Sequence, residues 1–210
     1  MKVGTIYIHY GSNVFDPALF KPIRNSEFIC SPASNVTDAG RMKNGEHNVE
    51  HNDEHRRIPS RMKDQTPPSK PSGGLWASRI DDAYGWAAWC RENGFNLAAL
   101  RHSFTFTLKS GSRVVELCSL ADINSLPLQR PWRPKDMSWM ETLRPGQIPT
   151  PEQLEALYTP NPVYIDFEKL VEMGVDAVEI VDYGAVAEAF PLWDCNSMIV
   201  LRAGAVEVVG

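Results

Sequence analysis

The sequence has little that would place the protein in a membrane or among strongly basic proteins. No run of apolar residues approaches the roughly 20 that a helix needs to cross a bilayer. The formal net charge is −5, which argues against unspecific binding to nucleic acid or anionic lipid, because both favour a basic surface. The opening MKVGTIYIHYGS has an alternating pattern where a signal peptide has a continuous apolar segment. We therefore expect a cytoplasmic protein with no membrane partner.

Cysteine is also scarce, and the common cofactor motifs are missing. The four cysteines are scattered, with no CxxC pair, and are typical of thiols in a reducing compartment: Cys30, Cys90, Cys118 and Cys195. There is no Rossmann glycine fingerprint, no P-loop and no HExxH motif. Redox chemistry on a dinucleotide, NTP-driven chemistry and zinc proteolysis therefore have little support, and we assign no metal ligands.

A polar segment at about residues 31–72 stands out from the rest of the chain. It is rich in proline, serine, asparagine and charge, and it has almost no aromatic or branched apolar residues. Such a segment buries too little apolar surface to offset the entropy lost on ordering. Because only one short strand precedes it, we interpret it as a flexible insertion into a single domain, residues 1–210.

The remaining sequence alternates between strand and helix patterns. Strands are predicted at 3–10, 74–78 and 176–182, with one or two more in 196–209. Residues 103–118 predict a hairpin, since two alternating runs flank Ser110-Gly111-Ser112. Helices are predicted at 81–93, 151–158 and 166–174. Short strands with two or three helices indicate an α+β fold.

Two further stretches allow a functional and a structural interpretation. Glu-His pairs recur every four residues over 46–55, a spacing that could hold a metal ion on a helix, although a solvated low-complexity tract is the simpler reading. LQRPWRPKDMSWM (128–140) is basic and aromatic and is suited either to a nucleic acid or protein partner or to an ordinary proline-rich surface loop.

The six tryptophans are typical of core packing or of a ring-binding cleft.

Three separated segments resemble the ADP-ribosyltransferase superfamily. IYIHYGSN is similar to the family's first strand, commonly leucine-tyrosine-histidine-glycine-threonine. GLWAS with DDAYGWAAWC resembles its glycine-isoleucine-tyrosine-phenylalanine-alanine strand and the helix that follows. FTFTLKSGSRVVEL, LVEMGVDAVEIVD and NSMIVLRAGAVEVV resemble the remaining strands. The resemblance implies a split β-sandwich that binds NAD as a substrate.

The resemblance also implies which residues form the site. Its NAD-binding residues are His9, Tyr10, Gly11, Gly74, Trp76, Ser78 and Tyr84. His9 would hydrogen-bond the NAD ribose, and Trp76 and Tyr84 would clamp the nicotinamide ring. The alternatives are a structural role for His9, core packing for both aromatic residues, and a helix N-cap in place of a ribose contact for Ser78.

The catalytic acid is where this sequence departs from the family. The family places a glutamate at the start of the final strand, and here that position falls on Asn196 or Ser197. Asp194 is the nearest acid and would act on the ribose from a bulge or loop, so the catalytic set implied is His9, Tyr84 and Asp194. Glu179 and Glu188 are weaker candidates. The alternative is that Asp194 only caps or turns the chain.

The expected function is NAD-dependent ADP-ribosyl transfer to a protein or nucleic acid acceptor, by an enzyme of the toxin, effector or phage-encoded kind. The alternatives are NAD hydrolysis, transfer onto an RNA 2′-phosphate as in the related phosphotransferases, and a non-catalytic module that binds NAD or another nucleotide.

Overall fold

The computed structural model describes residues 4–25, 70–159 and 161–209, which form a mixed α/β domain in one compact unit. The Glu-His repeat and most of the predicted insertion lie outside the described residues. The predicted end of the insertion at residue 72 is too late. Pro71 is buried, and Ser72 exchanges two backbone hydrogen bonds with Arg24, of 2.8 and 3.1 Å.

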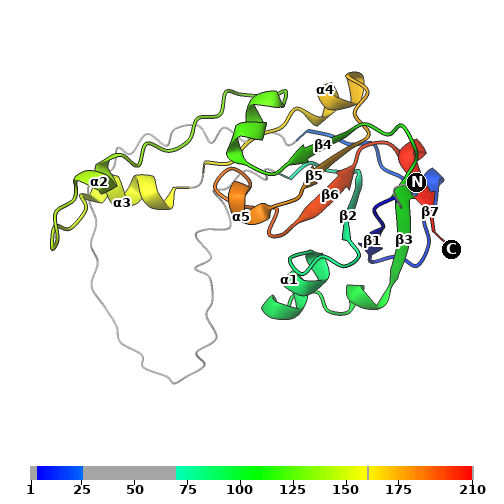
Figure 1. Cartoon of the computed structure of the whole chain (residues 1–210). Coiled ribbons are helices and arrows are strands. Elements are labelled where there is room, and N and C mark those ends of the chain that lie inside the picture. The colour runs from blue at the N-terminus through cyan, green and yellow to red at the C-terminus, as the bar shows by residue number, and fades with distance from the viewer. Residues whose placement is uncertain (1–3, 26–69, 160, 210) are drawn as a thin grey trace, which may run out of the picture. The chain divides into compact units, whose positions relative to one another are not determined.

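The strands form a seven-stranded sheet in the order β4-β5-β6-β2-β1-β3-β7 (Figure 1). Their bounds are β1 Tyr7–Tyr10, β2 Leu75–Arg79, β3 Ser103–Leu108, β4 Val114–Leu117, β5 Ala177–Ile180, β6 Ser197–Val200 and β7 Val206–Val208. All pairs are antiparallel except β4 with β5. Strands that precede and follow the predicted insertion, β1 and β2, are direct neighbours.

The helices are α1 Trp86–Asn93, α2 Trp139–Thr142, α3 Pro151–Tyr158, α4 Phe167–Glu172 and α5 Tyr183–Val186. The predictions at 151–158 and 166–174 are confirmed, and capping explains both starts. Thr150 and Gln153 form a capping box at α3, and the side chain of Asp166 accepts from the Lys169 N–H at α4. No helix among the described residues has both the length and the apolar character needed to cross a bilayer.

The predicted hairpin over 103–118 is wrong, although both of its strands exist. β3 pairs with β1 on one edge and β7 on the other, while β4 pairs with β5 at the far end of the sheet. The turn itself forms, with the Ser112 N–H bonded to the Lys109 carbonyl at 3.1 Å. Because both edges of β3 are occupied, the chain leaves the turn for a different part of the sheet.

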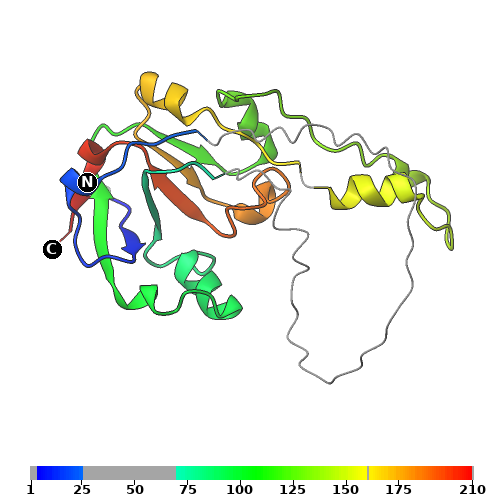
Figure 2. The same cartoon turned by 180° about the vertical axis from the view of Figure 1, so that it is seen from behind.

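Alternation along the strands separates two cores. Val178, Ile180 and Ile199 pack with apolar residues of α4 and α5, such as Leu170 and Val186. The other side of β5 and β6 packs with residues of β1, β2, β3 and β7. In both views α4 lies above β5 and β6, and α1 lies below them (Figure 1; Figure 2). Burial on both faces explains the nearly continuous apolar runs in β5 and β6.

The pairing between β1 and β2 is short, and the candidate site lies where this pairing ends. The ladder consists of Tyr7 opposite Arg79 and Ile8 opposite Ser78. Continued in register, it would place His9 opposite Ala77, but these residues do not pair. Beyond Ile8, residues of both strands line a cavity.

Candidate binding cavity

A cavity of about 360 Å³ opens between the ends of β1 and β2, and we call it the His9 cavity. This volume is within the usual range for small-molecule sites. Its walls come from β1, β2, α1, the loop after α1, and the region around β6: Ile8, His9, Tyr10, Gly11, Lys70, Trp76, Ala77, Trp86, Asn96, Ala99, Trp193 and Ser197.

A backbone hydrogen bond fixes the state of His9. Its Nδ1 atom lies 2.7 Å from the carbonyl oxygen of Trp76. Because a carbonyl oxygen only accepts, Nδ1 carries the proton, and in the neutral ring Nε2 is left as an acceptor. The ring is half-buried and packs against Phe104, with 5.2 Å between centroids. The backbone of β2 thus orients the His9 ring on the cavity wall, with Nε2 as the ring nitrogen that remains for a ligand.

Three tryptophans line the cavity. Trp76 meets the buried Trp193 edge to face, with centroids 4.8 Å apart. Trp86, at the start of α1, stacks on Trp89 with centroids 5.2 Å apart and an interplanar angle of 16°. Aromatic walls of this kind bind flat rings by stacking and by edge contacts.

Ser78 and Gly85 set the position of α1 and hence of Trp86. The Ser78 hydroxyl accepts from the Trp86 N–H at 2.9 Å and donates to the Asn196 carbonyl at 3.1 Å. A Cβ added at Gly85 would lie 3.0 Å from that of Ser78, so the backbone approaches β2 more closely than other residues allow. Ser78 is 3% exposed, and its hydroxyl is engaged in the fold. Ser78 is not the N-cap of α1, which is Gly85, but from its place in β2 its hydroxyl accepts from the first N–H of that helix.

Lys70 brings a positive charge to the aromatic walls. Its Nζ atom lies 5.5 Å from the ring centroid of Trp76 and 6.0 Å from that of Trp86, within the range of cation–π attraction. The same ammonium group pairs with Asp194 at 2.8 Å. Two tryptophans and one carboxylate thus surround a cation at the cavity.

The structure does not bring Tyr84 to this cavity, contrary to the sequence expectation. Tyr84 is 77% exposed and lines a separate cavity of about 770 Å³ with Tyr183, Asp194 and Asn196. The reason is local. The Asp82 side chain accepts from the Tyr84 N–H, and the backbone carbonyl of Asp82 accepts from the Gly85 N–H. Residues 82–85 therefore form a turn before α1. Trp86, two residues later, takes the wall position.

The other expected NAD-binding residues divide into two groups. Tyr10 and Gly11 line the His9 cavity, and Gly11 has a φ of +107°, a conformation that favours glycine. Gly74 does not line it. With a φ of +66°, and with a Cβ that would lie 2.8 Å from Ile199, Gly74 is required by the entry into β2.

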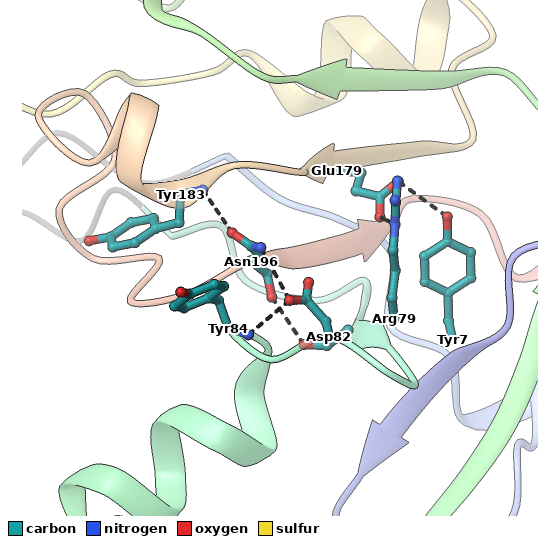
Figure 3. Close-up of polar contacts among 8 residues, drawn as sticks. Tyr7, Arg79, Asp82, Tyr84, Glu179, Tyr183 and Asn196 are labelled. Carbon is teal, nitrogen blue, oxygen red and sulfur yellow. Dashed lines mark hydrogen bonds and ion pairs between the residues drawn. The ribbon is translucent and has the colours of Figure 1, made fainter.

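No aspartate or glutamate of the described part of the chain lines the His9 cavity. Of the residues considered for the family's acid position, Ser197 reaches the cavity, and its hydroxyl donates to the Cys195 carbonyl at 3.1 Å. The Asn196 side chain is engaged elsewhere, accepting from the Tyr183 N–H and donating to Asp82 (Figure 3). Asp194 lies in the loop before β6 with a φ of +68°; it does not line the cavity, but its carboxylate pairs with Lys70, which does.

The two weaker acid candidates are engaged in structural contacts. Glu179 accepts two hydrogen bonds from Arg79 and one from the Tyr7 hydroxyl, in a buried network inside the sheet (Figure 3). This burial, together with the nearby Glu179 charge, raises the pKa of Tyr7. Glu188 accepts from the Lys135 backbone N–H at 3.2 Å. Neither lines the His9 cavity.

The basic stretch 128–140 makes internal contacts along its length. The Arg130 guanidinium lies over the Tyr164 ring at 4.4 Å, and the Trp132 indole donates to the Asn161 carbonyl at 3.0 Å. The Lys135 ammonium donates to the Leu157 carbonyl. These contacts attach the stretch to the segment 157–164, as expected for a packed surface loop.

Lys70, Trp86 and Trp193 line the cavity but are not among the site residues that the resemblance implies, although a ring-binding cleft is one of the two interpretations of the tryptophans. Trp86 had a usable signal, since it lies two residues after Tyr84 in a segment already assigned to the site. Lys70 falls within the predicted insertion, and no motif of the sequence distinguishes Trp193 from the other tryptophans. Comparison with models of protein families, with curated proteins and with solved structures found no match to this chain. Among the described residues, no group of histidine, cysteine and acidic side chains is arranged to hold a metal ion.

Proposed function

We propose that the His9 cavity binds NAD⁺ through its nicotinamide and the adjoining ribose. The observation that carries the proposal is the fixed tautomer of His9 beside aromatic walls. A ribose hydroxyl would donate to Nε2 of His9, while Trp76 and Trp86 would contact the nicotinamide ring. Both kinds of contact are those by which cavities select a flat ring joined to a sugar.

The arrangement of β1 and β2 supports the same proposal. In the ADP-ribosyltransferase resemblance, the first strand carries the histidine and the second carries an aromatic residue. Here His9 and Trp76 come from these two strands and are joined by a hydrogen bond. With no carboxylate on the described wall of the cavity, binding without turnover is the function that this geometry supports best.

Calorimetric titration of the full chain with NAD⁺ tests the proposal. We expect one binding site per chain and a loss of affinity of about tenfold in His9→Ala, the size of one hydrogen bond to a buried group. His102→Ala is a matched control, since this exposed histidine does not line the cavity. Absence of binding in the wild type, or equal affinities for both variants, would overturn the proposal.

A second candidate function is ADP-ribosyl transfer, and the Lys70–Asp194 pair favours it. If Lys70 releases Asp194, a carboxylate becomes available beside the nicotinamide riboside. It would stabilise the cationic sugar formed as the bond between nicotinamide and ribose breaks. Nicotinamide leaves with the bonding electrons, and an acceptor oxygen or nitrogen bonds to the sugar carbon and loses its proton. The acceptor would be a protein or nucleic acid.

Turnover separates the candidates. The full chain is incubated with labelled NAD⁺ and a cell lysate, and label transfer and nicotinamide release are both measured. Label on a macromolecule that is lost in Asp194→Asn supports transfer, whereas free ADP-ribose without an acceptor indicates hydrolysis. An RNA carrying a 2′-phosphate tests the phosphotransferase alternative directly. Binding with no nicotinamide release contradicts the transferase and leaves the binding function standing.

A further inference from the structure

Two tryptophans of the His9 cavity lie close to a positively charged side chain of the protein itself, that of Lys70. The ammonium group of Lys70 lies 5.5 Å from the ring of Trp76 and 6.0 Å from that of Trp86. The faces of aromatic rings attract cations, and cages of aromatic side chains are a common means of binding ligands with a permanent positive charge. The Lys70 side chain is one-third exposed, so water covers it only in part.

Asp194 adds the complementary charge. Its carboxylate lies 2.8 Å from the Lys70 ammonium and is 30% exposed. Asp194 also holds a backbone conformation with positive φ, which is uncommon outside glycine and tends to occur at functional sites. Two rings and one partly buried carboxylate therefore converge on one point, and that point is suited to a cation.

We propose that Lys70 occupies the place of a ligand's positive charge, so that the His9 cavity selects a cationic ring and Lys70 must withdraw when that ring enters. This inference rests on the proposed function, because the nicotinamide of NAD⁺ is a pyridinium cation, whereas the dihydronicotinamide of NADH is neutral. Lys70 is then a specificity-determining residue. It competes with the cationic ring, and Asp194 and the tryptophans stabilise whichever cation is present.

Small fragments test the charge preference without the phosphates of NAD⁺. The probes are 1-methylnicotinamide, which is a permanent cation, and nicotinamide, which is neutral and nearly the same shape. Binding is followed by tryptophan fluorescence in the full chain, for the wild type, Lys70→Met and Lys70→Arg. Lys169→Met is the matched control, because it removes a lysine from an exposed ion pair that does not line the cavity.

We expect Lys70→Met to bind 1-methylnicotinamide about tenfold more tightly than the wild type, since the internal competitor is gone and Asp194 is unpaired. Nicotinamide should change less than about twofold, and Lys70→Arg and Lys169→Met should match the wild type. Adding Asp194→Asn to Lys70→Met should reverse the gain. If Lys70→Met does not fold, as judged by circular dichroism, Lys70→Gln takes its place.

Two results would overturn the inference. One is unchanged or weaker binding of 1-methylnicotinamide in Lys70→Met. The other is an equal gain for both fragments, which would show that Lys70 blocks the cavity by its size alone. NAD⁺ titration of the wild type separates this failure from that of the proposed function. Binding of NAD⁺ with no preference for the cationic fragment would overturn only the inference. Binding of the cationic fragment without binding of NAD⁺ would overturn the proposed function, and of the inference only the charge preference of the cavity would stand.

Discussion

Arg79 holds the carboxylate of Glu179 through two hydrogen bonds, of 2.7 and 3.1 Å, at a point where the Glu179 side chain is only 4% exposed. The Tyr7 hydroxyl donates a third hydrogen bond to the same carboxylate at 3.1 Å. The three residues come from β1, β2 and β5, so the network joins strands that are not all neighbours in the sheet. It lies apart from the His9 cavity and has a structural role.

Glu179→Gln should therefore destabilise the protein. It leaves the Arg79 charge without its partner, which costs about 2–3 kcal/mol of unfolding free energy when the guanidinium is partly exposed and solvent screens some of the loss. Urea denaturation measures the change. Glu172→Gln is the control, since the Lys169–Glu172 pair is exposed and should contribute almost nothing. Equal stabilities for the two variants would show that the buried pair does not stabilise the sheet.

Ser78→Ala tests how α1 is held. The variant removes the acceptor of the Trp86 N–H and the donor to the Asn196 carbonyl, at a site that is 3% exposed. We expect a loss of about 1–2 kcal/mol in unfolding free energy, as for buried hydrogen-bonded groups. Ser125→Ala removes an exposed hydroxyl that donates to the Asp122 carbonyl and should have a much smaller effect. A loss no larger than that of Ser125→Ala would contradict the capping role.

Trp86 lines the His9 cavity, whereas the sequence-based expectation places Tyr84 there. The two assignments predict different effects of mutation on NAD⁺ binding. Trp86→Ala should weaken NAD⁺ binding by about tenfold or more, because a stacked ring contributes more than 1 kcal/mol in a desolvated pocket. Tyr84→Ala should leave the affinity within about twofold, since Tyr84 is 77% exposed and lines another cavity. Calorimetry on both variants decides. Stronger loss in Tyr84→Ala would restore the sequence-based assignment.

Thiol reactivity should separate the three cysteines that the structure describes. Burial raises the pKa of Cys195 to about 12, so its thiol stays protonated, while Cys90 is also buried and Cys118 is exposed. Desolvation and the nearby charges of Asp122 and Glu116 raise the pKa of Cys118 as well, so its exposure sets the order of labelling. In a Cys30→Ser variant, a thiol reagent at about pH 8 should label Cys118 first and the other two only after unfolding. Raising the pH to about 9 should speed labelling of Cys118 alone, since Cys195 keeps its proton well above that pH. A second fast thiol in the native protein would contradict the burial of Cys90 or Cys195.

Much of the local structure could be predicted from the sequence, because its signals are local. The capping residues of α3 and α4 lie beside the helices that they start, and the alternation in 103–108 marks β3 directly. The partner of each strand could not be predicted. A turn at 109–112 is typical of a hairpin. Here, however, β1 and β7 pair with the two edges of β3, and both are distant from it in sequence.

The residues of the candidate site also divide into those that the sequence predicts and those that it does not. The resemblance to the ADP-ribosyltransferase superfamily implies His9 and Trp76 as site residues, and both line the His9 cavity. The sequence pattern does not show that Asp82 forms a turn over residues 82–85, and this turn places Trp86, and not Tyr84, at the cavity. Lys70 was missed because a lysine in a polar tract has no pattern that distinguishes it from a solvated one. Its role follows from its distances to two tryptophan rings.

The most direct test of the central claim uses the indole N–H signals of the six tryptophans in an NMR spectrum of the full chain, assigned by single Trp→Phe variants. Trp76, Trp86 and Trp193 line the His9 cavity, whereas Trp132 and Trp139 do not and are internal controls. We predict that NAD⁺ shifts the signals of the first three and leaves the two controls in place. Shifts confined to Trp132 and Trp139, or no shift at millimolar NAD⁺, would contradict a nicotinamide site in this cavity.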